Sequence, residues 1–237
     1  MDSDGPHADV RDMYMVHATF RREFGALPGL VRGVKTGDTE RSQVLADHID
    51  ILSVYLYAHH HSEDIHLWPK LLERGSQEVA PIVYLMEDQH KNIEVLNNEV
   101  GEVVGGWCIN PVLESTEALA DLFGQLIRIL DEHMRLEEQR ILPLAAKYIT
   151  AAEWHAMADE SGRAIPQDRI PLVFGMTLYE ANPEVIQKTL AELPPEVRAV
   201  LQEQGPRAFA SHSERVYGTA TPPRTGAVMR SLRDHQS

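Results

Sequence analysis

Residues 59–69 read HHHSEDIHLWP, and residues 133–143 read HMRLEEQRILP. Both segments fit the pattern H-x3-E-x5-P, and each of its three fixed residues recurs 74 positions later in the second copy. A single histidine precedes each copy, His17 in the first half and His90 in the second, 73 positions apart. The first 150 residues therefore read as a duplicated helical hairpin, in which each half contributes one histidine and then an H-x3-E pair.

Apolar residues recur every three or four positions in four long stretches, which is the periodicity of α-helices with one buried face. The stretches run from Met13 to Phe24, from Leu45 to Glu63, from Val79 to Val100 and from Leu119 to Leu144. Strand-like alternation is nearly absent. We therefore expect an all-α protein whose residues 1–150 form an antiparallel, up-down-up-down four-helix bundle. Glycine and proline clusters at 25–29 together with Gly33 and Gly37, at 75–76 and at 105–111 are expected to separate its helices.

The last third of the chain has a different character. Thr150 and Glu153 form a capping box, which predicts a helix beginning at residue 151. Five prolines between residues 166 and 195 divide the next segment, with helix starts predicted at Asn182 and Pro195. We expect residues 151–217 to be a helical extension packed on the bundle. Residues 218–237, rich in Thr, Pro and Arg, are expected to be a flexible tail.

The composition excludes several classes of protein. The 237 residues include 36 Asp and Glu but only 22 Lys and Arg, a net charge of −14, whereas binding to nucleic acid or anionic membranes needs a basic face. No stretch approaches the roughly 18 apolar residues of a membrane span. The acidic, polar first residues predict no secretory signal, and a single cysteine, Cys108, excludes a disulfide framework. A cytoplasmic protein is therefore expected.

Polar residues interrupt the apolar face of every predicted bundle helix. Histidine and glutamate face a dry core only when something satisfies them. In an H-x3-E pair both side chains project from one helix face a turn apart, so two such pairs from two hairpins give two equivalent ligand sets. This is the geometry of a dinuclear metal centre. The predicted ligands are His17, His59, Glu63, His90, His133 and Glu137.

The donor types narrow the choice of metal. Imidazole and carboxylate without thiolate suit iron, manganese or zinc. Four histidines supply four metal–ligand bonds and two bridging glutamates supply four more, while two octahedral ions need about twelve positions. A shared solvent bridge fills two, which leaves about two open positions for a small molecule. We favour two iron ions, with zinc or manganese as substitutes, and a small diatomic ligand such as O2 or NO, or peroxide, as the partner.

These motifs resemble the hemerythrin-like, HHE cation-binding family of non-haem di-iron four-helix bundles. The family pattern places a histidine on the first helix, H-x3-E before Leu-aromatic-Pro on the second, a histidine on the third and H-x3-E on the fourth. Residues 8–150 meet it in full, including Leu67-Trp-Pro69. The resemblance implies an oxo- or hydroxo-bridged di-iron centre, with Glu63 and Glu137 bridging the irons and the histidines capping them.

One departure concerns a fifth histidine. The invertebrate oxygen carriers of this family have two histidines four apart on the third helix, whereas Met86 and Glu94 occupy the positions four before and four after His90. This argues against a reversible oxygen carrier. Some relatives with the same deficit recruit the residue after the second-helix histidine, which here is His60. It is either a further metal ligand or a solvated neighbour on the helix shoulder.

Other polar residues near the motifs have less specific patterns. Asp64, Glu138, Glu87 and Asp88 either orient ligand imidazoles or belong to a solvated acidic face. His61 and His66 are expected to lie outside the site.

Two functions fit these observations. The first is a binding or sensing protein whose di-iron centre takes up O2 or NO or reports redox or iron status. The second is a di-iron enzyme that decomposes peroxide or oxidises a small substrate with O2. Ferritin-like oxidases fit less well, because they use four glutamates and two histidines in Glu-x-x-His order. A helical interaction module without metal leaves the 74-residue repeat to chance.

Overall fold

The computed structural model describes residues 5–75 and 79–225, and these residues are almost entirely helical. No β-strand occurs in either range, which confirms the predicted all-α class. The helices are α1 (Arg11–Arg32), α2 (Thr39–His66), α3 (Trp68–Arg74), α4 (Ala80–Trp107), α5 (Leu113–Leu136), α6 (Leu142–Tyr148), α7 (Ala151–Ala164), α8 (Ile170–Leu178), α9 (Pro183–Glu192) and α10 (Pro195–Tyr217). A π-helix, η1 (Glu137–Ile141), joins α5 to α6, and a 3-10 turn, η2 (Gln167–Arg169), precedes α8.

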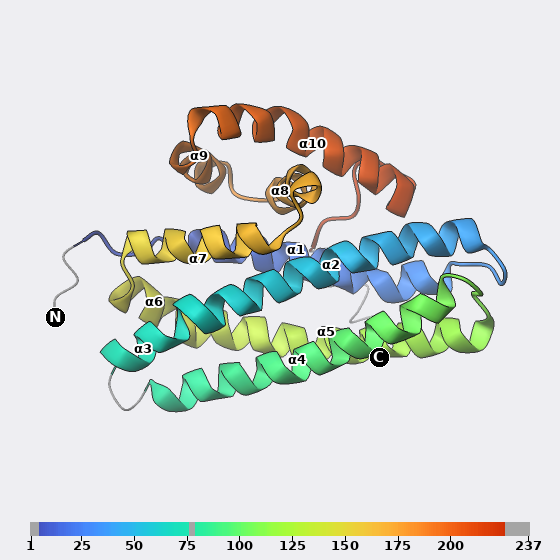
Figure 1. Cartoon of the computed structure of the whole chain (residues 1–237), viewed down its shortest axis with the longest axis horizontal. Coiled ribbons are helices and arrows are strands. Elements are labelled where there is room, and N and C mark those ends of the chain that lie inside the picture. Colours follow the sequence, from blue (N-terminus) through green and yellow to red (C-terminus); the bar gives the residue numbers. More distant parts are fainter. Residues whose placement is uncertain (1–4, 76–78, 226–237) are drawn as a thin grey trace.

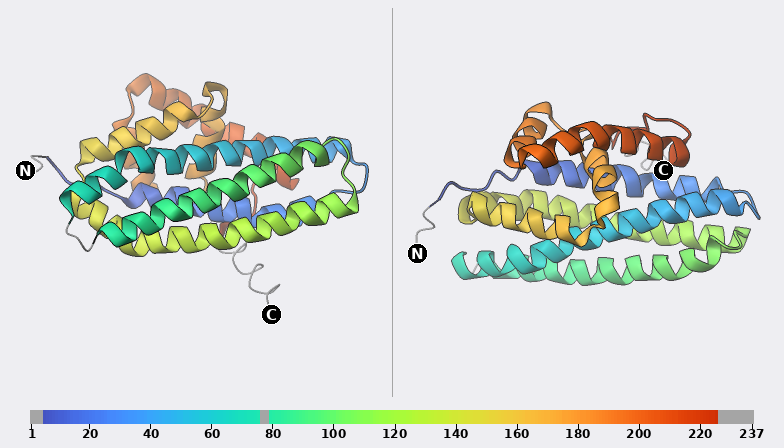
Figure 2. Two further views of the ribbon diagram at one scale, coloured as in Figure 1. Left: turned by 60° about the horizontal axis from the view of Figure 1, so that its bottom comes forward. Right: turned by 45° about the horizontal axis from the view of Figure 1, so that its top comes forward.

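Four long helices, α1, α2, α4 and α5, lie side by side along the longest dimension of the molecule (Figure 1). Helix α7 packs lengthwise on α2, α8 contacts α1, and α10 covers α8, so the C-terminal helices form a second layer over one face of the four (Figure 2). Among the described residues, no helix has both the length and the apolar character that a membrane span needs.

The apolar core is divided into two clusters. One is formed by residues such as Phe20, Phe123 and Leu130, and the other by residues such as Trp68 and Ile141. On each of the four long helices or its direct continuation, a predicted metal ligand separates residues of the first cluster from residues of the second. The polar positions therefore form a layer across the middle of the apolar interior, which shields them from water.

The two prolines of the repeated motif begin new helices. Helix α2 ends at His66, and Pro69 is the second residue of α3. Pro143 is likewise the second residue of α6, directly after η1. A proline in the first turn of a helix loses no hydrogen bond, because the N–H of that position has no partner within the helix. The two copies of the motif therefore share a helix start at the same distance from their ligand pair.

Two of the predicted clusters do separate helices, but only at their C-terminal ends. Residues 25–29 lie inside α1, which includes Pro28 and ends at Arg32, and residues 33–38 separate it from α2. Helix α4 extends through Gly105 and Gly106, and residues 108–112 separate it from α5. In both cases tertiary packing extends the helix: Leu27 and Val31 are fully buried in the last turns of α1, and Trp107 is buried at the end of α4. This burial offsets the local cost of proline and glycine in a helix.

The C-terminal helices begin where the sequence predicts. Thr150 and Glu153 form the reciprocal capping box of α7, Asn182 caps α9, and α10 spans Pro195–Tyr217. Of the predicted tail, residues 226–237 lie outside the described residues. In the part before them, Thr225 donates hydrogen bonds to the Glu180 carboxylate and to a backbone oxygen of α1.

A buried ion-pair network ties the second layer to the bundle. The fully buried Arg22 of α1 donates to Glu23 at 2.6 Å and to Glu180, which follows α8, at 2.8 Å. The Tyr217 hydroxyl of α10 donates to the second oxygen of Glu23 at 2.6 Å. Glu23 is therefore paired with a guanidinium of its own helix and accepts a hydrogen bond from α10.

Arg22→Met is expected to lower the free energy of unfolding by about 3 kcal/mol, because Glu23 and Glu180 lose the guanidinium that compensates their burial. The control is Arg32→Met, whose half-exposed guanidinium pairs with exposed carboxylates and should contribute less than about 1 kcal/mol. Urea unfolding of the metal-free protein measures both. Equal losses in the two variants would contradict the structural importance of the network.

Candidate metal centre

Seven buried side chains from the four long helices and η1 meet in the middle of the bundle. They are the seven residues named from the sequence, and each is at most 7% exposed. The ligand atoms of His17, His59 and Glu137 all lie within 4.8 Å of one another, as do those of His60, His90 and His133. A third such set joins Glu63 to His133 and Glu137. The structure thus brings all the predicted site residues together.

Each glutamate faces one histidine from the pair His17 and His59 and one histidine from the set His60, His90 and His133. One oxygen of Glu63 lies 3.4 Å from His59 Nε2, and its other oxygen lies 3.4 Å from His90 Nε2. Glu137 Oε2 is 3.2 Å from His17 Nε2 and 3.7 Å from His133 Nε2. A carboxylate placed between two sets of imidazoles can bridge two cations, so the geometry provides for two adjacent metal positions.

Three of the histidines are oriented by acceptors at Nδ1. The partner of His17 Nδ1 is Glu138 at 2.9 Å, and that of His90 Nδ1 is Asp64 at 2.8 Å. His133 Nδ1 lies 3.2 Å from the amide oxygen of Gln89. Because each acceptor holds the Nδ1–H in a hydrogen bond, Nε2 is the nitrogen that faces the cluster and can coordinate a metal ion.

The carboxylates that hold these histidines belong to the repeat as well. Asp64 directly follows the first motif glutamate, and Glu138 directly follows the second. Asp64, from the first hairpin, holds His90 of the second, whereas Glu138, from the second, holds His17 of the first. The two hairpins therefore orient each other's ligands, and the contacts follow the pseudo-twofold relation between them.

The aromatic residue of the Leu-Trp-Pro segment supports this arrangement. Trp68 Nε1 donates to Asp64 Oδ1 at 2.8 Å, and the Trp68 ring packs near the His90 ring. Glu138, the orienting carboxylate of the second half, instead accepts from Arg21 of α1 at 2.7 Å, so a guanidinium takes the place of the indole N–H. Each orienting carboxylate is itself held in position.

The residues fit a bound metal. Among the described residues, the buried side-chain atoms that lack a hydrogen-bond partner are concentrated here: Nε2 of His17, His59 and His60, and both oxygens of Glu63 and Glu137. His90 Nε2 and His133 Nε2 face each other at 3.3 Å, where two lone pairs repel unless a proton or a metal ion lies between them. Burying nitrogen and oxygen atoms without a partner costs free energy, and coordination of a metal ion would supply the missing partner.

His60 lies inside the cluster. It is 7% exposed, and its ring stacks on His90 with centroids 4.1 Å apart. Its counterpart 74 positions later is Met134, so the two halves differ here. Met86 is buried in the apolar core and Glu94 is exposed, and neither belongs to a set of ligand atoms in the described part of the chain. The structure therefore favours His60 as the position of the fifth imidazole.

The remaining polar candidates lie elsewhere. His61 stacks on Tyr57, and His66 faces Glu160 at 3.8 Å. Among the hydrogen bonds of residues 5–75 and 79–225, none joins Glu87 or Asp88 to a cluster histidine. Of the four acidic residues weighed as orienting groups, Asp64 and Glu138 orient ligands.

Two contributors were missed in the sequence. Gln89 orients His133, and only its position directly before His90 could have suggested it. Arg21 supports Glu138, and its one signal is the i, i+4 spacing from His17 on the same helix face.

Without metal, the cluster holds protons. Burial alone would lower the pKa of His17 and His90, but nearby carboxylates stabilise the protonated rings, those of Glu137 and Glu138 at His17 and those of Asp64 and Glu63 at His90, and raise each pKa to about 9. Burial, followed by the charge of Glu137, raises the pKa of Glu63 to about 8. Burial lowers the pKa of His133 to about 3.

Two hollows border the cluster on different sides. A cavity of about 250 Å³ lies between α1, α2, α7 and α8 and reaches His59. A pocket of about 580 Å³ between α2 and α4 reaches His60 and His90, with Asp64 and Asn97 in its wall. The first is mainly apolar and the second mainly polar in its lining residues.

Metal uptake at neutral pH is expected to release about three protons per chain, because His17, His90 and Glu63 must lose their protons to coordinate. Metal binding should therefore weaken as the pH falls, and proton release should diminish as the pH rises through 8 to 9. Titration of the metal-free protein with zinc in weak buffer, followed with a pH indicator, measures the number of protons released. The Glu63→Gln variant should release about one proton fewer. Metal uptake without proton release at neutral pH would refute this protonation scheme.

Comparison with known proteins agrees with the geometry. Neither the curated proteins nor the solved structures contain a significant match. The hemerythrin HHE cation binding domain matches residues 8–145, the segment that contains all seven clustered residues and more than half of the chain. The chain therefore belongs to the hemerythrin HHE cation-binding domain family.

Proposed function

We propose that this protein holds a non-haem di-iron centre within an antiparallel, up-down-up-down bundle of α1, α2, α4 and α5, and that it binds or senses O2, NO or the redox or iron status of the cell. The observation that carries the proposal is the pair of buried glutamates, Glu63 and Glu137, each facing histidines of both groups. Membership of a cation-binding family supports it.

The donor set supports iron. Five imidazoles and two carboxylates offer nitrogen and oxygen but no sulfur, and manganese or zinc can occupy the same donors. When bound, two irons supply open coordination positions and electrons to a small diatomic ligand or to peroxide.

The chain controls what reaches the metal. Asp64 and Glu138 fix the imidazoles of His90 and His17, so the donor atoms need little rearrangement when an ion binds. The two apolar clusters on either side of the polar layer keep bulk water away from the glutamates. The polar pocket at His60 and His90 gives ions and small molecules a route inward.

A second function, a di-iron enzyme that decomposes peroxide or oxidises a small substrate with O2, is favoured by the cavity that reaches His59. Detection of a diatomic gas does not require a cavity of that size next to the site, whereas an organic substrate does.

The test combines iron content with the optical spectrum after reconstitution under nitrogen. Wild-type protein should hold about two irons per chain and melt at a higher temperature with iron than without, because binding energy adds to folding energy. Glu63→Ala should lose both effects, whereas Glu99→Ala, which removes an exposed carboxylate of α4, should keep them. Undiminished iron content in Glu63→Ala would contradict the proposal.

The same preparation separates the two functions. A sensor should change its spectrum reversibly with O2, NO or azide. An enzyme should consume peroxide, or O2 with a substrate, over many turnovers, and His133→Ala should abolish this activity.

A further inference from the structure

We propose that the cavity between the bundle and the C-terminal helices binds an uncharged, mainly apolar organic molecule of about two aromatic rings that carries at most a hydroxyl group, and holds it against His59. This inference deepens the proposed function. It rests on that function only for the metal at His59, since the cavity itself requires no metal.

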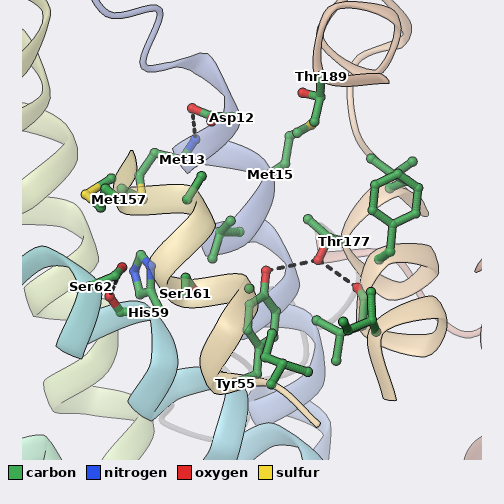
Figure 3. A pocket seen from close by; sticks show the side chains of 18 of the residues that line it. Asp12, Met13, Met15, Tyr55, His59, Ser62, Met157, Ser161, Thr177 and Thr189 are labelled. Carbon is green, nitrogen blue, oxygen red and sulfur yellow. Dashed lines mark hydrogen bonds between the residues drawn. The ribbon is translucent and has the colours of Figure 1, made fainter. Parts of the chain in front are cut away.

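The walls of the cavity come from both layers of the molecule. Met13 and Met15 of α1 form one side, Met157 of α7 another and Val173 of α8 a third, while His59 lies at the inner wall (Figure 3). An apolar cavity of about 150 Å³ accommodates benzene. At about 250 Å³, this one has room for a molecule of roughly two rings.

The lining disfavours an anionic ligand. Of the described residues that line the cavity, none is Lys or Arg, so an anion would be buried without a counter-ion. The carboxylate of Asp12 belongs to the wall. It accepts hydrogen bonds from Trp154 Nε1 at 3.0 and 3.1 Å and from the Met13 amide at 3.0 Å. Asp12 thus has protein partners on both oxygens, and its charge repels anions further.

The hydroxyl groups of Tyr55 and Ser62, on the same helix as His59, use their protons within the protein, which leaves them as acceptors for a ligand. The Thr177 hydroxyl donates to the Val173 carbonyl at 2.9 Å, so the Tyr55 hydroxyl is the donor in their 3.0 Å contact. The Ser62 hydroxyl likewise donates to the His59 carbonyl. Tyr55, whose hydroxyl lies at the cavity in Figure 3, therefore offers a lone pair and no proton. A hydroxyl on the ligand can donate to it, whereas a carbonyl cannot.

The position of His59 connects the cavity to the metal centre. This imidazole borders the cavity on one side and belongs to the ligand set with His17 and Glu137 on the other. The polar pocket reaches the cluster at His60 and His90, which belong to the other set of ligand atoms. The organic molecule and the small ligand thus have separate routes to the centre.

The binding test uses 1-naphthylamine, an uncharged fluorescent probe with two fused aromatic rings, with metal-free and iron-loaded protein. Its fluorescence should rise on binding to both forms. As competitors, 2-naphthol and 2-naphthoate share one ring system and differ in charge. We expect 2-naphthol to displace the probe at a concentration at least tenfold lower than 2-naphthoate needs, because the carboxylate of 2-naphthoate would be buried without a partner. Equal competition, or stronger competition by 2-naphthoate, would overturn the proposal.

Variants of α7 locate the bound probe. Ser161 lies beside His59 at the cavity, and Ala158 lies at its exposed rim (Figure 3 shows Ser161), so Ser161→Phe and Ala158→Phe should each weaken probe binding about tenfold by filling the space. Ala152→Phe, an exposed position of α7 outside the cavity, is the matched control and should bind normally. Normal binding by both cavity variants, or equal weakening in the control, would overturn the assignment.

The outcomes separate this inference from the proposed function. A protein that binds the probe but takes up no iron keeps the cavity and refutes the metal centre. A protein that takes up iron but does not bind the probe refutes the cavity alone. If a phenylalanine variant fails to fold, as judged by circular dichroism, the naphthol and naphthoate competition on the wild-type protein still decides.

Discussion

Two carboxylates buried in the middle of an apolar helical bundle are the constraint on which the rest of the structure depends. Glu63 and Glu137 are fully buried, and taking each ionised group out of water costs several kcal/mol unless cations face it. In the metal-free protein, protons on His17, on His90 and on Glu63 itself meet this need, and in the proposed metal-bound form the metal ions would replace them. The apolar clusters on both sides make the compensation necessary, because they exclude the water that would otherwise solvate the glutamates.

The duplicated hairpin explains how one short motif builds the whole centre. The glutamate of each motif faces histidines of both halves, and the acidic residue after it holds a histidine of the other half. Neither hairpin completes its own ligand set, so the halves must assemble to satisfy these groups. The proline that ends each motif begins a new helix directly behind the ligands. In the second half a π-helix, a feature frequent at functional sites, carries Glu137.

Much of this could be predicted from the sequence, because helical periodicity and the 74-residue repeat are local patterns. All seven predicted residues meet in one cluster, and the capping box at Thr150 and the start at Asn182 begin helices as expected. The errors have a common cause, which is tertiary packing. Burial of Leu27 and Val31 carries α1 past Pro28, and Gln89 reaches His133 only because α4 and α5 pack together. The cavity at His59 exists only where α7 and α8 cover the bundle, so no local pattern encodes it.

The second layer therefore gives this protein a feature beyond the hemerythrin domain, namely an apolar cavity at His59 in addition to the polar pocket at His60 and His90. The central claim, a dinuclear centre bridged by two glutamates, is tested most directly by crystals grown with ferrous iron under nitrogen and measured at the iron absorption edge. The account predicts two anomalous peaks, one beside His17 and His59 and one beside His90 and His133, with Glu63 and Glu137 between them. A single peak, or peaks away from these residues, would contradict it.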